Sequence, residues 1–98
     1  MSRRLIEVEL TIDGRATMPV LTGGIYRPHL RVEDGEYLGV SFVDGPQARP
    51  ALLARALAAL VYEPGVDYSA LAVGTHFEVF EGPKVVGSGR VLRGPFTA

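Results

Sequence analysis

Hydrophobic and polar side chains alternate at the start of the chain. Between Leu5 and Ile12, apolar residues stand at every second position and acids or threonine stand between them. This period of two is typical of a strand with one buried face. Asp13-Gly14 then predicts a turn, because both residues tolerate positive φ. Residues 17–21 are expected to form a short strand, with Pro19 at a sheet edge.

Four more segments have the pattern of strands. Residues 25–32 and 36–43 both alternate apolar and polar positions, and a Glu-Asp-Gly turn separates them. Residues 76–81 and 84–92 follow later in the chain, with only Gly82-Pro83 between them. The last two segments are therefore predicted to form a closing hairpin.

The segment 44–63 has a different pattern. Pro50 is suited to a first helical turn, and apolar residues then recur at three- and four-residue spacings, at Leu52, Leu53, Ala56, Leu57 and Leu60. We therefore expect a helix over residues 50–60, followed by a loop over residues 66–73. Five or six short strands with one inserted helix predict a mostly β fold, arranged as a small antiparallel barrel or sandwich.

The composition is that of one small globular domain. With 98 residues, the chain can close one hydrophobic core but has no room for a second domain of ordinary size. The net charge of −1 provides no global attraction to nucleic acid or anionic lipid. Cysteine is absent, which excludes disulfides and thiolate chemistry. The start of the chain lacks the apolar core of a signal peptide, and the longest apolar stretch is too short to span a bilayer, so we expect a cytoplasmic protein without a membrane partner.

Three motifs follow one another at characteristic distances. They are Pro19 to Gly23 with Tyr26-Arg27-Pro28 after it, then Gly-x-x-Phe-x-Val-x-Glu-Gly at residues 74–82, and Val-Gly-x-Gly-x-Val at residues 86–91. In this order and spacing, they resemble the C-terminal β-barrel domain (domain 3) of the elongation factor Tu family. The resemblance implies a stand-alone small barrel. The glycines at 87 and 89 also have a physical role, because they leave one face of a strand without side chains and permit close backbone approach.

The chain also departs from this family. Two residues, Gly24 and Ile25, separate the glycine at position 23 from Tyr26, whereas the family tyrosine usually follows its glycine directly. No phosphate-binding loop is present, so we expect no binding or hydrolysis of GTP. The predicted helix falls where the family has β hairpins, and the central third of the chain therefore lies outside the resemblance.

The resemblance implies a site at the hairpin loop 80–84. In the family, the corresponding loop helps to hold the T-stem backbone of aminoacyl-tRNA. Glu81, Gly82 and Lys84 match the family pattern, whereas Phe80 and Pro83 replace an arginine and a glycine. These two changes remove a cation and a backbone amide, and so weaken the prediction of a phosphate contact. The alternative is a tight hairpin with a solvated lysine.

Three residues of the segment 25–32 are predicted to share one strand face. Arg27, His29 and Arg31 are two residues apart, so neighbouring side chains stand roughly 7 Å from each other, which suits successive phosphates. The alternative, which we prefer for Arg31, is an ordinary ion pair with Glu7 or Glu9 of a neighbouring strand. For Arg27, the resemblance implies a role in packing or in an interdomain face.

The leading hypothesis is a non-enzymatic binding module that contacts a protein or ribonucleoprotein partner, with translation suggested by the resemblance alone. The residues predicted to bind the partner are Tyr26, Arg27, His29, Phe80, Glu81, Gly82, Lys84 and Arg90. Weak, salt-dependent contact with tRNA or other RNA is an alternative mode. We expect a monomer or a weak homodimer formed through the helix at residues 50–60.

A second hypothesis is a small-ligand or catalytic domain with a pocket between the helix and the barrel, polar at His29, His76 or Tyr62. The two histidines lack the spacing of metal ligands, and no serine stands in a nucleophile-elbow context. The sequence therefore predicts neither a metal nor a cofactor, and no catalytic residue.

Overall fold

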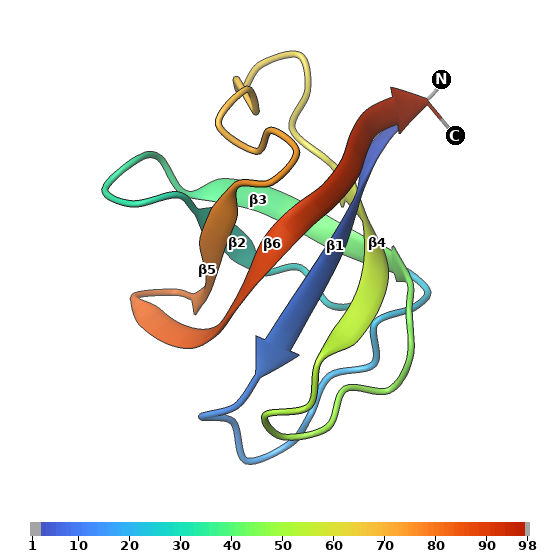
Figure 1. Cartoon of the computed structure of the whole chain (residues 1–98), viewed down its shortest axis with the longest axis vertical. Coiled ribbons are helices and arrows are strands. Elements are labelled where there is room, and N and C mark those ends of the chain that lie inside the picture. Colours follow the sequence, from blue (N-terminus) through green and yellow to red (C-terminus); the bar gives the residue numbers. More distant parts are fainter. Residues whose placement is uncertain (1–2, 98) are drawn as a thin grey trace.

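Six antiparallel strands close into one barrel in the computed structural model, which describes residues 3–97 (Figure 1). The strands are β1 (Arg4–Ile12), β2 (His29–Arg31), β3 (Leu38–Asp44), β4 (Ala54–Leu60), β5 (His76–Glu81) and β6 (Lys84–Thr97). Around the barrel, their order is β1-β4-β3-β2-β5-β6, and β6 pairs with β1 to close the ring. The mostly β fold and the antiparallel barrel are therefore confirmed.

The core consists of the side chains that point inward at every second position of a strand. In β1, the inward residues Ile6, Val8, Leu10 and Ile12 are each at most 1% exposed. Leu30 is the inward residue of β2, and the later strands contribute Val40, Phe42, Phe77, Val79, Val86 and Val91. Because this period of two is visible in the sequence, strands β1, β3 and β5 lie close to their predicted bounds.

The predicted helix over residues 50–60 is wrong, because this segment contains β4 and no helix is present in residues 3–97. The inward residues of β4 are alanines and a leucine, and Ala59 on the opposite side of the strand is buried as well. Because alanine and leucine occupy both faces of this strand, apolar residues also recur every three or four positions. This spacing is the same as that of an amphipathic helix. Pro50 forms an isolated bridge with Ile12 instead of beginning a helix.

The strands predicted at residues 17–21 and 25–32 are shorter than expected. The first is reduced to an isolated bridge between Val20 and Gln47. The second retains β2, although pairing with β3 continues before it, since the carbonyls of Tyr26 and Pro28 accept hydrogen bonds of 3.0 and 3.1 Å. The prolines explain both differences, because a proline has no N–H to donate to a neighbouring strand.

The close approach predicted for Gly87 and Gly89 is confirmed. A methyl group at Gly87 would lie 2.2 Å from the carbonyl oxygen of Thr11, and one at Gly89 would lie 2.2 Å from that of Glu9. The absence of side chains at both positions thus lets β6 pass close to β1. This contact closes the barrel.

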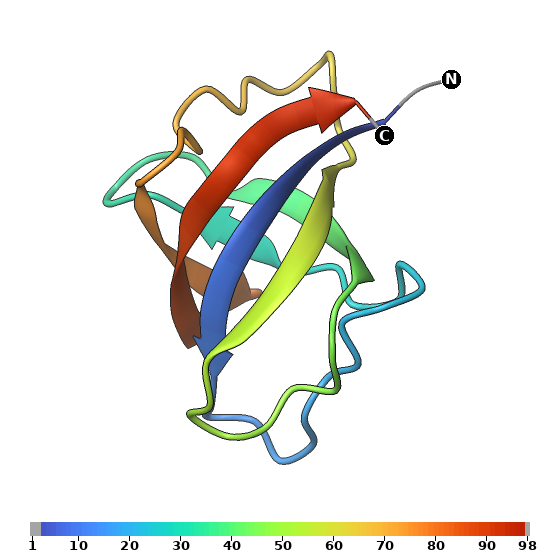
Figure 2. The same ribbon diagram turned by 45° about the vertical axis from the view of Figure 1, so that its right-hand side comes forward.

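Loops cover the two ends of the barrel (Figure 2). Residues 61–75 lie over one end, where Tyr68 is buried and donates a hydrogen bond of 2.5 Å to the carbonyl oxygen of Gly39. Burial raises the pKa of Tyr68 above its ordinary value. Residues 13–22 and 45–53 lie at the other end, where Leu21 is fully buried. The expected loop over residues 66–73 is therefore part of the barrel's packing.

Candidate functional site

Arg27, His29 and Arg31 lie on the outer face of the barrel, as their spacing predicts. Leu30 between them is fully buried in the core, and successive side chains of a strand point to opposite sides. The alternation of buried and outward side chains extends back to Pro28. Pro28 is buried, and its carbonyl oxygen accepts a hydrogen bond from Val40 of β3. Two cations and a histidine are therefore aligned along one outer row.

The preferred pairing of Arg31 with Glu7 or Glu9 is wrong. Glu9 accepts from Arg90 of β6, with 2.9 Å between Nη2 and Oε1, and Glu7 pairs with Arg93 at 3.3 Å. These contacts follow from the strand order, which places β6 beside β1 and β2 on the far side of the barrel. Cross-strand pairing occurs as expected, but with different arginines.

Arg31 is held in place by one backbone carbonyl and two aromatic rings. Its Nε donates a hydrogen bond of 2.8 Å to the carbonyl oxygen of Gly35. Its guanidinium carbon lies 4.8 Å from the ring centroid of Tyr37 and 6.0 Å from that of Phe80. The guanidinium is thus positioned by a carbonyl and two rings, and its terminal nitrogens are not used by these contacts.

Arg27 is anchored in a similar way. Its Nε donates to the carbonyl oxygen of Gly24 at 3.3 Å. Neither Arg27 nor Arg31 forms an ion pair with any carboxylate of residues 3–97. Arg3, Arg49 and Arg55 form none either within these residues, whereas Arg4, Arg15, Arg90 and Arg93 do. The two arginines of the outer row therefore combine a fixed position with free donors.

Aromatic rings flank this row on the side of β5. Phe80 is only 6% exposed, and Tyr37 packs edge-on against it with 5.0 Å between ring centroids. Tyr37 also meets His29 edge-on at 6.4 Å and remains 47% exposed. Together with Gly82 and Pro83, His29 and Tyr37 line an open hollow of about 320 Å³. Phe80 supports this surface from below and is not itself available to a partner.

A second exposed ring lies on the side of β3. Tyr62 is 55% exposed, and an edge of its ring occupies the space above Gly39. A methyl group at Gly39 would lie 2.3 Å from Cε2 of Tyr62 and 3.5 Å from Nε2 of His29. Tyr62 and Arg27 also line one hollow of about 740 Å³, together with Arg3. We call Arg27, His29, Arg31, Tyr37 and Tyr62 the β2 face.

Two of the predicted partner-binding residues bind each other. The hydroxyl of Tyr26 donates to Oε2 of Glu81 at 2.6 Å, and Nε of Arg15 contacts the same oxygen at 2.6 Å. The Tyr26 ring stacks on the core residue Phe42 at 5.9 Å. Burial, and then the hydrogen bond to Glu81, raise the pKa of Tyr26 well above its ordinary value. This cluster joins the end of β5 to the loop after β1.

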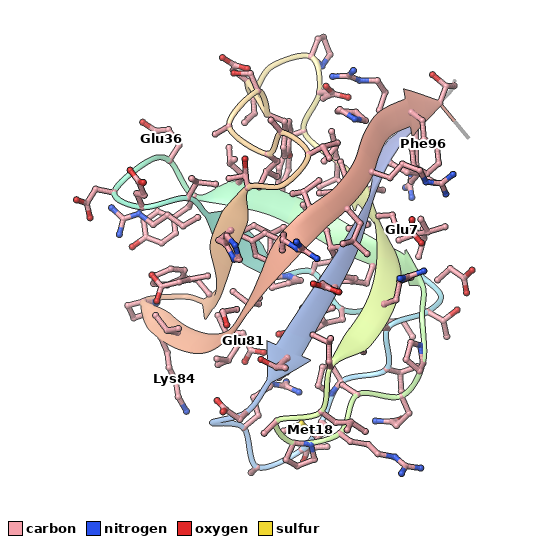
Figure 3. All side chains as sticks on the ribbon, viewed as in Figure 1. Glu7, Met18, Glu36, Glu81, Lys84 and Phe96 are labelled. Atoms are coloured by element: carbon pink, nitrogen blue, oxygen red, sulfur yellow. The ribbon has the colours of Figure 1, made fainter. Side chains whose placement is uncertain are left out.

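Lys84 and Arg90 also lie apart from the β2 face, whereas Gly82 lines a hollow with His29 and Tyr37. Lys84 projects away from the hairpin, and its Nζ donates a hydrogen bond of 2.6 Å to the carbonyl oxygen of Gly14 (Figure 3). Gly82 adopts a φ of 59° in the hairpin turn, a conformation that favours glycine. Arg90 is bound to Glu9, as described above. Of the predicted set, the structure therefore brings together Arg27, His29, Phe80 and Gly82.

The pocket predicted between a helix and the barrel does not form, because the helix is absent. His76 lines a different hollow, of about 530 Å³, over β1, β5 and β6 with Glu9, Glu78 and Arg90. Arg31 of β2 and Glu33 also line this hollow. His29 and Tyr62 do not line that hollow. Residues 3–97 contain no cluster of three side chains that could hold a metal ion, and no helix of theirs is long and apolar enough to cross a membrane.

The predicted dimer interface also loses its helix. Leu52 and Leu53 are 56% and 61% exposed, but they belong to the loop before β4. Leu60 is buried in the barrel. Any self-association through this region would therefore use a loop, and the oligomeric state stays a prediction.

Neither the protein-family models nor the curated proteins contain a match to this chain. The likeness to the elongation factor Tu family therefore stays a resemblance of motifs. Sequence reasoning missed Tyr37, and it placed Tyr62 in a pocket rather than on the β2 face. The glycine at position 39 is a local signal, because a strand glycine often marks a place where another group approaches closely.

Proposed function

We propose that the chain is a non-enzymatic binding module and that the β2 face contacts its partner, a protein or a ribonucleoprotein. One observation carries this proposal. Arg27 and Arg31 are each anchored at Nε by a backbone carbonyl, and neither meets a carboxylate within residues 3–97. Their free donors stand beside two half-exposed tyrosines.

This arrangement favours binding for two physical reasons. Tyrosine and arginine are enriched among the residues that contribute most to interfaces, because they offer large contact areas together with hydrogen-bond donors. A side chain that is already anchored also loses less conformational entropy when a partner binds. The association with translation rests on the motif resemblance alone.

Site-specific photocrosslinking tests the proposal. A photoreactive residue at position 62 or 37 should form discrete adducts with a partner in cells, because both side chains project from the β2 face. The matched control is position 55 in β4, where Arg55 is exposed and pairs in register with Glu9 of β1. Identical adducts from all three positions, or none from any, would contradict a partner surface at β2.

A further inference from the structure

The two anchored arginines of the β2 face define the charge of the ligand. A guanidinium whose Nε is occupied keeps both terminal nitrogens, which form the planar fork that fits two oxygens of one anion. Arg27 and Arg31 lie on either side of His29 in one row and are four residues apart, roughly 13 Å along an extended strand, so they can hold two anions of one chain with the position beside His29 between them. A phosphodiester chain and an acidic peptide both satisfy this requirement.

The tyrosines distinguish between these two ligands. Tyr62 and Tyr37 border hollows on opposite sides of the row, and each leaves about half of its surface exposed. Planar bases stack on such rings without regard to sequence, whereas an acidic peptide has no planar group repeated at every anion. Cations in a row with rings beside them are the combination used by proteins that bind single strands.

The acidic loop between β2 and β3 limits how much nucleic acid the face can accept. Glu33, Asp34 and Glu36 are exposed, and Figure 3 shows Glu36 near the tip of this loop. None of the three forms an ion pair within the described part of the chain. Glu33 lines the same hollow as Arg31, and Glu78 lies opposite Arg31, so phosphates beyond those held by the two arginines, including those of a second strand, would be repelled. The charge distribution therefore favours one strand over a duplex.

Building on the proposed function, we propose that the partner of the β2 face is single-stranded nucleic acid. Phosphates contact Arg27 and Arg31, and bases stack on Tyr62 and Tyr37. Because only two phosphates are bound by fixed cations, the affinity is modest and depends on salt. The logarithm of the affinity should fall with the logarithm of the salt concentration with a slope of about −1.4, from roughly 0.7 per phosphate of a single strand.

Fluorescence anisotropy with a labelled oligouridylate of roughly ten nucleotides tests this inference. Arg27→Ala should reduce the salt slope by about 0.7, because one phosphate contact is lost. Tyr62→Ala should weaken binding about tenfold at every salt concentration and leave the slope unchanged, because stacking involves no counterion. Arg55→Ala is the matched control, since it removes the same charge from an exposed position of β4, which β3 separates from β2.

The outcomes separate this inference from the proposed function. Equal or tighter binding of a duplex of the same length would overturn the single-strand assignment, as would equal effects of Arg27→Ala and Arg55→Ala. If no oligonucleotide binds while position 62 crosslinks to a protein, the inference fails and the proposed function stands. If neither experiment detects a partner, both fail. Circular dichroism of each variant establishes that the barrel is intact.

Discussion

The β2 face and the opposite side of the barrel use the same residue types in different ways. On the outer face of β1 and β6, Glu7 and Glu9 neutralise Arg93 and Arg90 across the strands. On the β2 face, Arg27 and Arg31 are held by carbonyl oxygens and form no ion pair with a carboxylate of residues 3–97. The arginines on the outer face of β1 and β6 are therefore neutralised by carboxylates of the same face. The arginines of the β2 face are held in position for an external group.

The difference lies in the contacts that each arginine makes, since both sides of the barrel place an acid opposite an arginine. An arginine in an antiparallel sheet meets the side chain directly opposite, and β6 presents its arginines to the acids of β1. On the β2 side, Arg31 lies opposite Glu78 of β5, but its Nε donates to the carbonyl oxygen of Gly35 and it forms no ion pair within residues 3–97. Exposed ion pairs contribute little to stability, so the unpaired β2 face costs the fold little.

The largest expected effect concerns the side of the barrel formed by β1 and β6. Gly89→Ala would place a methyl group 2.2 Å from the carbonyl oxygen of Glu9, and a backbone atom cannot move aside cheaply. We expect a loss of about 3 kcal/mol in the free energy of unfolding, measured by urea denaturation. Gly65→Ala is the control, because its nearest contact is at 3.5 Å. Equal stability of the two variants would show that β1 and β6 do not depend on this close approach.

Gly39, which lies under Tyr62 on the β2 face, should behave differently. At Gly39, the methyl group of Gly39→Ala would meet the ring of Tyr62, which is half-exposed and can rotate away. The free energy of unfolding should fall by only about 1 kcal/mol, while oligouridylate binding weakens about tenfold as the ring leaves its position. Parallel denaturation and anisotropy measurements distinguish the two effects. A variant that loses stability but binds normally would remove Tyr62 from the site.

Tyr26 connects β5 to the first loop and gives the barrel a response to alkaline pH. Its pKa is raised above the ordinary value of 10.0, so the folded state keeps the phenol proton at pH values where the unfolded chain has lost it. This contribution to stability is complete below about pH 10 and is lost at higher pH. Tyr26→Phe should cost about 1 kcal/mol at neutral pH, because Glu81 loses a hydrogen bond.

Denaturant titrations between pH 9 and pH 12 check this expectation. The free energy of unfolding should fall more steeply above about pH 10 for the wild type than for Tyr26→Phe. Parallel curves would contradict a role for the phenol proton. Binding to the β2 face should not change, because Tyr26 points into the barrel.

The smallest expected effect is on the ion pairs of β1. Glu7→Gln removes the partner of Arg93, whose side chain is 65% exposed, so the free energy of unfolding should change by about 0.5 kcal/mol or less. The same variant gives a further comparison with the β2 face, because it leaves Arg93 unpaired. If Arg93 then contributed to oligonucleotide binding as strongly as Arg27, charge alone would explain binding, and the anchors at Nε would have no role.

Much of the fold follows from local patterns. The period of two in residues 5–12 and 36–43 predicts strands, because successive side chains of a strand point alternately to the core and to the exterior. Gly82-Pro83 marks the hairpin, and the glycines at 87 and 89 mark a close approach. The common face of Arg27, His29 and Arg31 also follows from spacing alone. Each of these inferences needs only neighbours along the chain, and each agrees with the structure.

The remaining features depend on partners that are distant along the chain. Residues 54–60 form a strand because β1 and β3 pair with both of its edges, although alanine and leucine suit a helix equally well. The partners of Glu7 and Glu9 depend on the strand order. Tyr62 belongs to the β2 face only because the segment after β4 places its ring over Gly39 of β3. These contacts arise from closure of the barrel, since adjacency around a ring of strands is not contained in the periodicity of any one of them.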